Sequence, residues 1–133
     1  MTALQAHIRN LLEDHNIRSS FDAGAIDQLL DEDAKLVLYR VVQEALSNVV
    51  RHSGATSVSV TVQVEGASIV AVVADDGCGF EDPRITRGGG LGLLGMKERA
   101  ASAGGTVHVE SRLSQGTKVR LSIPQTSGET VHG

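Results

Sequence analysis

The sequence has few aromatic residues and a single cysteine, and this scarcity excludes several kinds of site and core. Among its 133 residues it has no tryptophan, one tyrosine and two phenylalanines, so its core must be built from aliphatic side chains. Cys78 is the single cysteine, which excludes an internal disulfide, and no CxxC or CxxH spacing suggests zinc. We therefore expect a reducing, cytoplasmic setting.

Long apolar runs and clusters of basic residues are also missing. No apolar run approaches the roughly 20 residues that span a bilayer, and residues 2–15 are amphipathic rather than a signal sequence, so we expect no membrane contact. The formal net charge is −4. Because binding to a phosphate backbone requires a positive face, we expect no nucleic-acid partner either. The isolated chain is expected to be a monomer.

The spacing of apolar residues predicts helices and β-hairpins in an irregular order. Helices are predicted over 2–15, 32–52 and 93–103, the second capped by Asp31 or Asp33 and stopped at Gly54. A short strand is predicted over 17–21, and hairpins over 56–66 with 68–77 and over 106–112 with 116–125. The first of these hairpin strands alternates, with four valines expected on its buried face: Val58, Val60, Val62 and Val64.

This order of elements limits the fold class. Helices do not alternate regularly with strands, so a doubly wound parallel sheet is disfavoured. We predict a two-layer α/β sandwich, in which one mixed, mostly antiparallel sheet is covered on one face by helices. Residues 1–125 are expected to form a single domain, and residues 126–133 a frayed tail.

The stretch from 72 to 96 holds two groups of glycines. Asp75 ends a predicted buried strand and is followed by Gly77 and Gly79. A carboxylate in that place can accept a hydrogen bond from an exocyclic amine, while the glycines let the backbone approach a flat base. An ordinary Asp-Gly turn explains the same residues equally well.

The second group of glycines, 88–95, runs into the predicted helix that begins near Leu93. Backbone N–H groups in such a loop and at a helix N-terminus form a site for phosphates. The pattern is neither a P-loop, since no GK[ST] follows, nor a dinucleotide fingerprint, since no strand directly precedes it. Taken alone, a flexible loop and a close helix contact explain it nearly as well.

Glu44 and Asn48 lie four residues apart on the long predicted helix and share a narrow polar stripe with Arg51. A carboxylate can polarise a water molecule, and an amide oxygen is a suitable ligand for Mg²⁺. The alternative is a solvated helix face, which is the common role of such pairs. The apolar character of the rest of the helix favours the functional interpretation.

The three motifs together resemble a known family. In this order, EALSNVVRH, DDGCGF and GGGLGLLGMKERA are similar to the N, G1 and G2 boxes of the GHKL ATPases, which include gyrase, a heat-shock chaperone, histidine kinases and MutL. Over residues 33–124 the sequence looks most like the catalytic domain of two-component sensor histidine kinases of the nitrate-sensing NarX and oxygen-sensing DevS type. The resemblance implies a Bergerat-type ATP-binding fold with ATP and Mg²⁺ as cofactors.

The resemblance also assigns roles on the metal and phosphate side. Asn48 matches the residue that contacts Mg²⁺, and Glu44 matches the residue that activates a water molecule or polarises the metal. These two are the expected catalytic residues. Gly90, Gly92 and the helix start at Leu93 match positions that face the phosphates.

On the adenine side, Asp75 matches the carboxylate that takes the adenine amino group, and Gly77 and Gly79 shape that pocket. Thr117, in GTKV, matches the threonine that helps to hold the adenine and a bridging water molecule. Residues 81–90 correspond to a short lid over the nucleotide.

A phosphoacceptor histidine is expected outside this chain, because neither His7 nor His15 has the acidic context of an H-box. The resemblance therefore implies transfer of the γ-phosphate to a histidine on a separate dimerisation domain, and onward transfer to a response-regulator receiver domain. Two alternatives remain open: an anti-sigma-factor type of serine kinase, and an ATP-binding sensing module that transfers nothing.

Overall fold

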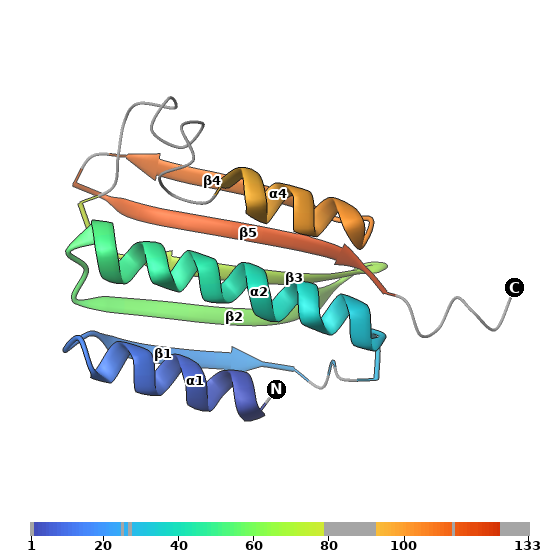
Figure 1. Cartoon of the computed structure of the whole chain (residues 1–133), viewed down its shortest axis with the longest axis horizontal. Helices are drawn as coiled ribbons and strands as arrows, with labels where there is room; N and C mark the ends of the chain where they lie inside the picture. The colour runs from blue at the N-terminus through green and yellow to red at the C-terminus, as the bar shows by residue number, and fades with distance from the viewer. Residues whose placement is uncertain (1, 25, 27, 79–92, 113, 126–133) are drawn as a thin grey trace, which may run out of the picture.

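A computed structural model describes residues 2–24, 26, 28–78, 93–112 and 114–125 of the chain (Figure 1). Within these ranges, helices and strands follow one another in an irregular order, as the sequence predicted. The elements are α1 (Thr2–Glu13), β1 (Arg18–Ala23), α2 (Glu32–Asn48), η1 (Val49–Ser53), β2 (Ser57–Glu65), β3 (Ser68–Asp75), α4 (Leu93–Ser102), β4 (Thr106–Arg112) and β5 (Gly116–Pro124).

The five strands form one mixed sheet in the order β1-β2-β3-β5-β4. β1 pairs with β2 in parallel, whereas β2 with β3, β3 with β5, and β4 with β5 are antiparallel. Figure 1 shows α1, α2 and α4 side by side over one face of this sheet. The predicted two-layer α/β sandwich with a mostly antiparallel sheet is therefore confirmed.

The core lies between the helices and the sheet, and alternation along the strands decides which side chains reach it. In β2, Val58, Val60 and Val62 are buried. Val64 was predicted to be buried with them but is 48% exposed. It lies one residue before the end of β2, where the chain turns through Gly66 into β3, so alternation alone overstated its burial.

Helix α2 begins as the sequence predicted. The Asp31 side chain accepts a hydrogen bond from the Ala34 N–H at 2.8 Å, which satisfies one of the unpaired donors of the first turn. At the other end the helix widens into the π-helical turn η1, which ends at Gly54 with φ of 64°. The stop at Gly54 is confirmed, and the π-helical turn was not predicted.

Among the residues that the structure describes, no helix is both long and apolar enough to span a bilayer.

Candidate functional site

The topology brings the sequence-predicted residues to one end of the molecule. Figure 1 shows the end of α2, the end of β3, the end of β4 and the start of β5 at the same end of the sandwich, while α4 begins part-way along β4 and β5. Antiparallel pairing sets this arrangement: in the register Asp75 lies opposite Thr117, and Thr117 lies opposite Ser111. A row of polar side chains thus crosses three strands at the edge of the helix-facing side.

Asp75 closes β3, and the backbone around it holds its carboxylate in place. Oδ1 accepts a hydrogen bond from the Gly77 N–H at 2.8 Å. Burial raises the pKa of the Asp75 carboxyl above its usual value, although hydrogen bonds from the backbone of Gly77 and Thr117 act in the opposite direction, and the charge of Asp76 adds to the rise. A half-buried carboxylate with a raised pKa is a common feature of functional sites.

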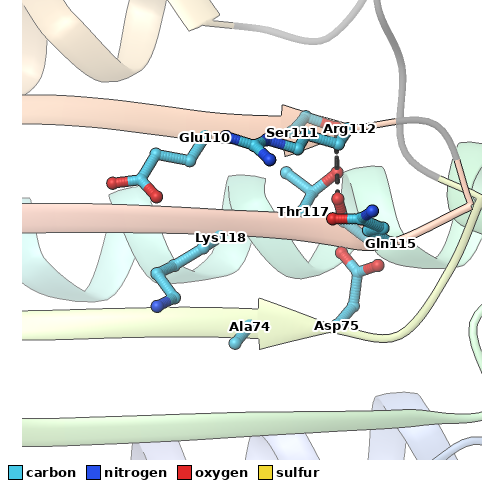
Figure 2. Close-up of a pocket in the computed structure, with 9 residues that line it drawn as sticks. Ala74, Asp75, Glu110, Ser111, Arg112, Gln115, Thr117 and Lys118 are labelled. Carbon is cyan, nitrogen blue, oxygen red and sulfur yellow. Dashed lines mark hydrogen bonds between the residues drawn. The ribbon is translucent and has the colours of Figure 1, made fainter.

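Thr117 lies beside Asp75, and its hydroxyl is held from the next strand. Its Oγ1 atom is 2.8 Å from Oγ of Ser111, and Ser111 Oγ is also 3.3 Å from the carbonyl oxygen of Gly116 (Figure 2). Ser111 was not singled out from the sequence, because a serine in an alternating strand gives no signal that separates it from a solvated one.

These side chains border a hollow of about 370 Å³ at the end of the sheet. Figure 2 shows Asp75 and Thr117 next to each other on neighbouring strands, with charged side chains farther along β4 and β5. Because successive residues of a strand point to opposite faces, Ala74, Glu110 and Lys118 lie on the face of the sheet that the helices do not cover, so this hollow opens mainly away from the helix-facing row (Figure 2). The residues around it are Ala74, Asp75, Glu110, Ser111, Arg112, Gln115, Gly116, Thr117 and Lys118.

The loop that follows Asp75 is fixed by the turn between β4 and β5. The Ser114 N–H donates to the Cys78 carbonyl oxygen at 2.7 Å, and Ser114 has φ of 65°. Gly77 is buried in this loop. The turn and the loop thus form one hydrogen-bonded unit, which keeps the Asp75 carboxylate and the Thr117 hydroxyl in a fixed relation.

Asp76 was not singled out from the sequence, and the structure shows that it joins the end of β3 to the start of β2. Its carboxylate accepts hydrogen bonds from the N–H and hydroxyl of Thr56 at 2.8 and 2.7 Å, and from those of Ser57 at 3.0 and 3.2 Å. The Ser57 backbone and the Thr56 hydroxyl and backbone hold the pKa of Asp76 far below its usual range. The neighbouring carboxylates therefore differ in role: Asp76 is structural, and Asp75 remains the candidate for ligand binding.

On α2, Glu44 and Asn48 lie in the last two turns, next to η1. Glu44 Oε2 is 3.4 Å from the Arg51 guanidinium, with both side chains partly exposed, and Arg51 Nε also donates to the Ser47 carbonyl oxygen at 3.4 Å. The side-chain oxygen of Asn48 is buried. The predicted polar stripe of this helix is therefore present, with Glu44 and Arg51 joined across it.

Several predicted residues cannot be placed. Gly79, Gly90, Gly92 and the predicted lid, residues 81–90, lie outside the described residues. Leu93 is the first residue of α4, as predicted.

The side-chain oxygens of Glu44 and Asn48 on α2 are of a chemical type that binds Mg²⁺. Within the described ranges, no three His, Cys, Asp or Glu side chains gather closely enough to hold a metal. Mg²⁺ usually binds one or two protein oxygens together with phosphate oxygens and water. A buried amide oxygen at Asn48 and a carboxylate one turn earlier are donors of that kind.

Comparison with known proteins agrees with this geometry. The family described as "Histidine kinase-, DNA gyrase B-, and HSP90-like ATPase" matches residues 33–127. The oxygen sensor histidine kinase NreB of Staphylococcus carnosus (strain TM300) is 36% identical over 124 residues, which cover 93% of this chain and 36% of NreB. The chain thus spans about a third of the length of this relative.

Solved structures share the fold. The blue-light activated histidine kinase of Erythrobacter litoralis EL346 superimposes with a TM-score of 0.80 at 20% identity, over 98% of this chain and 42% of that one. The Acinetobacter baumannii histidine kinase AdeS gives a TM-score of 0.74 at 16% identity, over 94% and 64%. The family match covers well over half of the sequence, and the chain therefore belongs to the histidine kinase-, DNA gyrase B- and HSP90-like ATPases.

Proposed function

We propose that residues 1–125 form the ATP-binding catalytic domain of a two-component sensor histidine kinase. The domain binds Mg·ATP and transfers the γ-phosphate to a histidine on a separate dimerisation domain, from which it passes to a response-regulator receiver domain. The observation that carries the proposal is the row formed by Asp75, Thr117 and Ser111 at the end of the molecule where α2 ends.

The adenine end of the proposed site rests on Asp75. An ionised carboxylate only accepts hydrogen bonds, so it complements the exocyclic amine of adenine and repels the carbonyl of guanine. Gly77, together with Gly79, gives the base room to approach the backbone. Thr117 lies within one strand spacing of Asp75 and supplies a hydroxyl for the base or for a water molecule that bridges to it.

The phosphate end is assigned to α2, α4 and the glycine-rich loop. Asn48 provides an amide oxygen for Mg²⁺, and Glu44 orients a water molecule or polarises the metal. When bound, the metal ion neutralises charge on the phosphates. Gly90, Gly92 and the N-terminus of α4 at Leu93 supply backbone N–H groups, which favour anions. The domain positions the γ-phosphate and does little covalent chemistry, as is usual for phosphoryl transfer.

Nucleotide binding is the first test. Isothermal titration calorimetry of the purified chain with ATP and MgCl₂ should show binding, and Asp75→Asn should abolish it by replacing an acceptor-only group with an amide. Asp22→Asn, an exposed aspartate on β1, is the matched control and should bind ATP like the unaltered chain. If Asp75→Asn binds ATP as tightly as the unaltered chain does, the assignment of Asp75 to the adenine amine is wrong.

Phosphoryl transfer is the second test, and it also separates the alternatives. The chain is incubated with radiolabelled ATP and either a histidine-containing dimerisation domain of a related kinase or an anti-anti-sigma protein. We expect an acid-labile phosphohistidine on the first substrate. Phosphoserine on the second would instead indicate a serine kinase, and tight ATP binding with neither product would indicate a sensing module. Asn48→Asp should retain adenine recognition but lose metal-dependent transfer.

A further inference from the structure

The sheet has a second face, which none of the described helices covers (Figure 1), and which we call the open face. Because successive residues of a strand point to opposite faces, side chains from four neighbouring strands lie in one row on it. The row consists of Ser20 on β1, Ser59 on β2, Ala74 on β3 and Lys118 on β5. Asp75 follows Ala74 directly but belongs to the helix-facing side, so the open face takes no part in the proposed nucleotide site.

Two hollows adjoin on the open face at Ala74, which lines both of them. One, of about 330 Å³, extends over β1 and β2, where Arg18 borders small side chains that include Ser57 and Ser59. The other is the hollow of about 370 Å³ described above, which extends over β5 and β4 and includes Lys118. We call the two together the open-face trough. Its floor of serine and alanine lets a ligand come close to the strands.

The side chains on the open face around this trough carry more positive than negative charge. Three of them are exposed cations, Arg18, Arg112 and Lys118, and none of the three forms an ion pair with another described residue. Glu110, opposite Lys118 on β4, is an anion on the same face (Figure 2). Asp76 also borders the trough, but four hydrogen bonds already stabilise its carboxylate. In a chain of net charge −4, this surface is therefore complementary to an acidic ligand.

The spacing of the cations suits an extended peptide better than a small molecule. Arg18 on β1 and Lys118 on β5 are separated by three strand spacings, which is about 14 Å across the sheet. In an extended peptide, carboxylates four residues apart share one face and span about the same distance. We propose that the open-face trough is a docking site for an extended acidic segment of a partner protein. The proposal does not rest on ATP binding, because the two sites lie on opposite faces of the sheet.

The experiment measures binding of a synthetic peptide to the whole chain by fluorescence anisotropy. The probe is a fluorescein-labelled peptide of glycine and serine, nine residues long, with glutamate at its second, sixth and eighth positions. We expect saturable binding at low ionic strength that weakens as salt is added. The same peptide with lysine in place of glutamate should not bind. Moving the middle glutamate to the fifth position puts its carboxylate on the other face of an extended peptide and should weaken binding, whereas unchanged affinity would contradict the extended geometry.

Charge reversal tests where the peptide binds. Arg18→Glu and Lys118→Glu should each weaken binding of the glutamate peptide at least about 5-fold, because each replaces an attraction with a repulsion. Arg40→Glu, at an exposed arginine on α2 in the helix layer, is the matched control with the same change in net charge, and it should bind like the unaltered chain. If Lys118→Glu melts at a lower temperature because it faces Glu110, Lys118→Gln provides the comparison. Equal losses in Arg40→Glu, or none at Lys118, would overturn the proposal.

Competition distinguishes the acidic peptide from other anionic ligands. Free glutamate and a short single-stranded oligothymidine are each added to the complex of the chain with the labelled peptide. We expect the unlabelled glutamate peptide to displace the probe at lower concentrations than either competitor. If free glutamate displaces it equally well, the trough binds small anions, and if the oligothymidine displaces it better, the trough binds nucleic acid. Either result, or the absence of peptide binding to the unaltered chain, would overturn the proposal and leave the assignment of ATP binding untouched.

Discussion

Gly116 leaves no room for a side chain against Asp75. A Cβ atom added to Gly116 would lie 2.0 Å from the carbonyl oxygen of Asp75 and 3.2 Å from the Cα atom of Asp76. Gly116 also has φ of +85°, a conformation that side chains disfavour. The first residue of β5 is thus glycine for two separate reasons, and both keep the end of β3 close to Thr117.

Gly116→Ala should strongly destabilise the fold. The positive φ alone costs about 1–2 kcal/mol for a residue with a Cβ atom, and overpacking against backbone adds about 1–3 kcal/mol. Urea unfolding at pH 7 measures the free energy of unfolding. Gly66→Ala is the matched control, because Gly66 has a φ of +62° with nothing within 4 Å of an added Cβ. If Gly116→Ala lowers the free energy of unfolding no more than Gly66→Ala does, the backbone must shift to relieve the contact between the added Cβ atom and the Asp75 carbonyl oxygen.

The stability of the fold should depend on Asp76 in acid. In the unfolded chain Asp76 takes up a proton near its ordinary pKa of 3.8, whereas its hydrogen bonds to Thr56 and Ser57 keep the native carboxylate ionised at lower pH. Asp76 therefore stabilises the native state above pH 3.8, and this contribution is lost as the pH falls toward its depressed native pKa.

We expect Asp76→Asn to lower the free energy of unfolding at neutral pH and to flatten its decline below about pH 4. Urea unfolding at pH steps between 2 and 7 measures both effects, with Asp22→Asn as the control at an exposed aspartate. If the free energies of unfolding of the unaltered chain and of Asp76→Asn change in parallel down to pH 2, the charge of the Asp76 carboxylate contributes nothing to stability.

Much of the fold follows from local pattern. The spacing of apolar residues in α2, its cap at Asp31 and its stop at Gly54 depend only on nearby residues, and so do the two hairpins. The order of these elements was enough to disfavour a doubly wound sheet. The parallel pairing of β1 with β2, in contrast, joins segments about 40 residues apart, and no local pattern in this sequence encodes it.

A residue of the candidate site could be predicted from the sequence where its type and its neighbours together indicate its chemical role. Asp75 was identified because an acidic residue before two glycines suits an amine, and its raised pKa agrees with that interpretation. Asp76 and Ser111 were missed because their roles depend on partners brought by the fold: Asp76 on Thr56 and Ser57, and Ser111 on Thr117 across the β4–β5 pair. A sequence with no structure gives such residues no distinguishing sign.

Asp75→Asn should make the protein slightly more stable while it loses ATP. The native pKa of Asp75 is raised, mainly by burial, so the native state holds its proton more tightly than the unfolded state. Stability is therefore lost as the pH rises from 3.8 through the native pKa, and the ionised side chain is a net cost at pH 7. The neutral amide should raise the Tm at pH 7 by about 1–3 °C.

Differential scanning calorimetry at pH 7 and at pH 3 distinguishes this effect from a general change in packing. The advantage of Asp75→Asn should disappear at pH 3, where the carboxyl is protonated in both states. An equal or larger advantage at pH 3 would mean that the amide stabilises the loop by its hydrogen bonds and not by removing a buried charge.

The ion pair between Glu44 and Arg51 should matter for transfer far more than for stability. Its atoms are 3.4 Å apart, and the two side chains are 37% and 55% exposed, so solvent screening limits its contribution to about 0–1 kcal/mol. Glu44→Gln should therefore unfold in urea within about 0.5 kcal/mol of the unaltered chain and bind ATP with similar affinity, because Glu44 lies away from the adenine end. In the reconstituted transfer reaction, however, Glu44→Gln should form phosphohistidine at least about 10-fold more slowly.

The control variant Arg51→Gln breaks the same ion pair from the other side. It shows whether the ion pair or the Glu44 carboxylate is responsible for the loss of transfer rate. An equal loss of rate in both variants would assign the effect to the ion pair, and an unaltered rate in Glu44→Gln would remove Glu44 from the reaction.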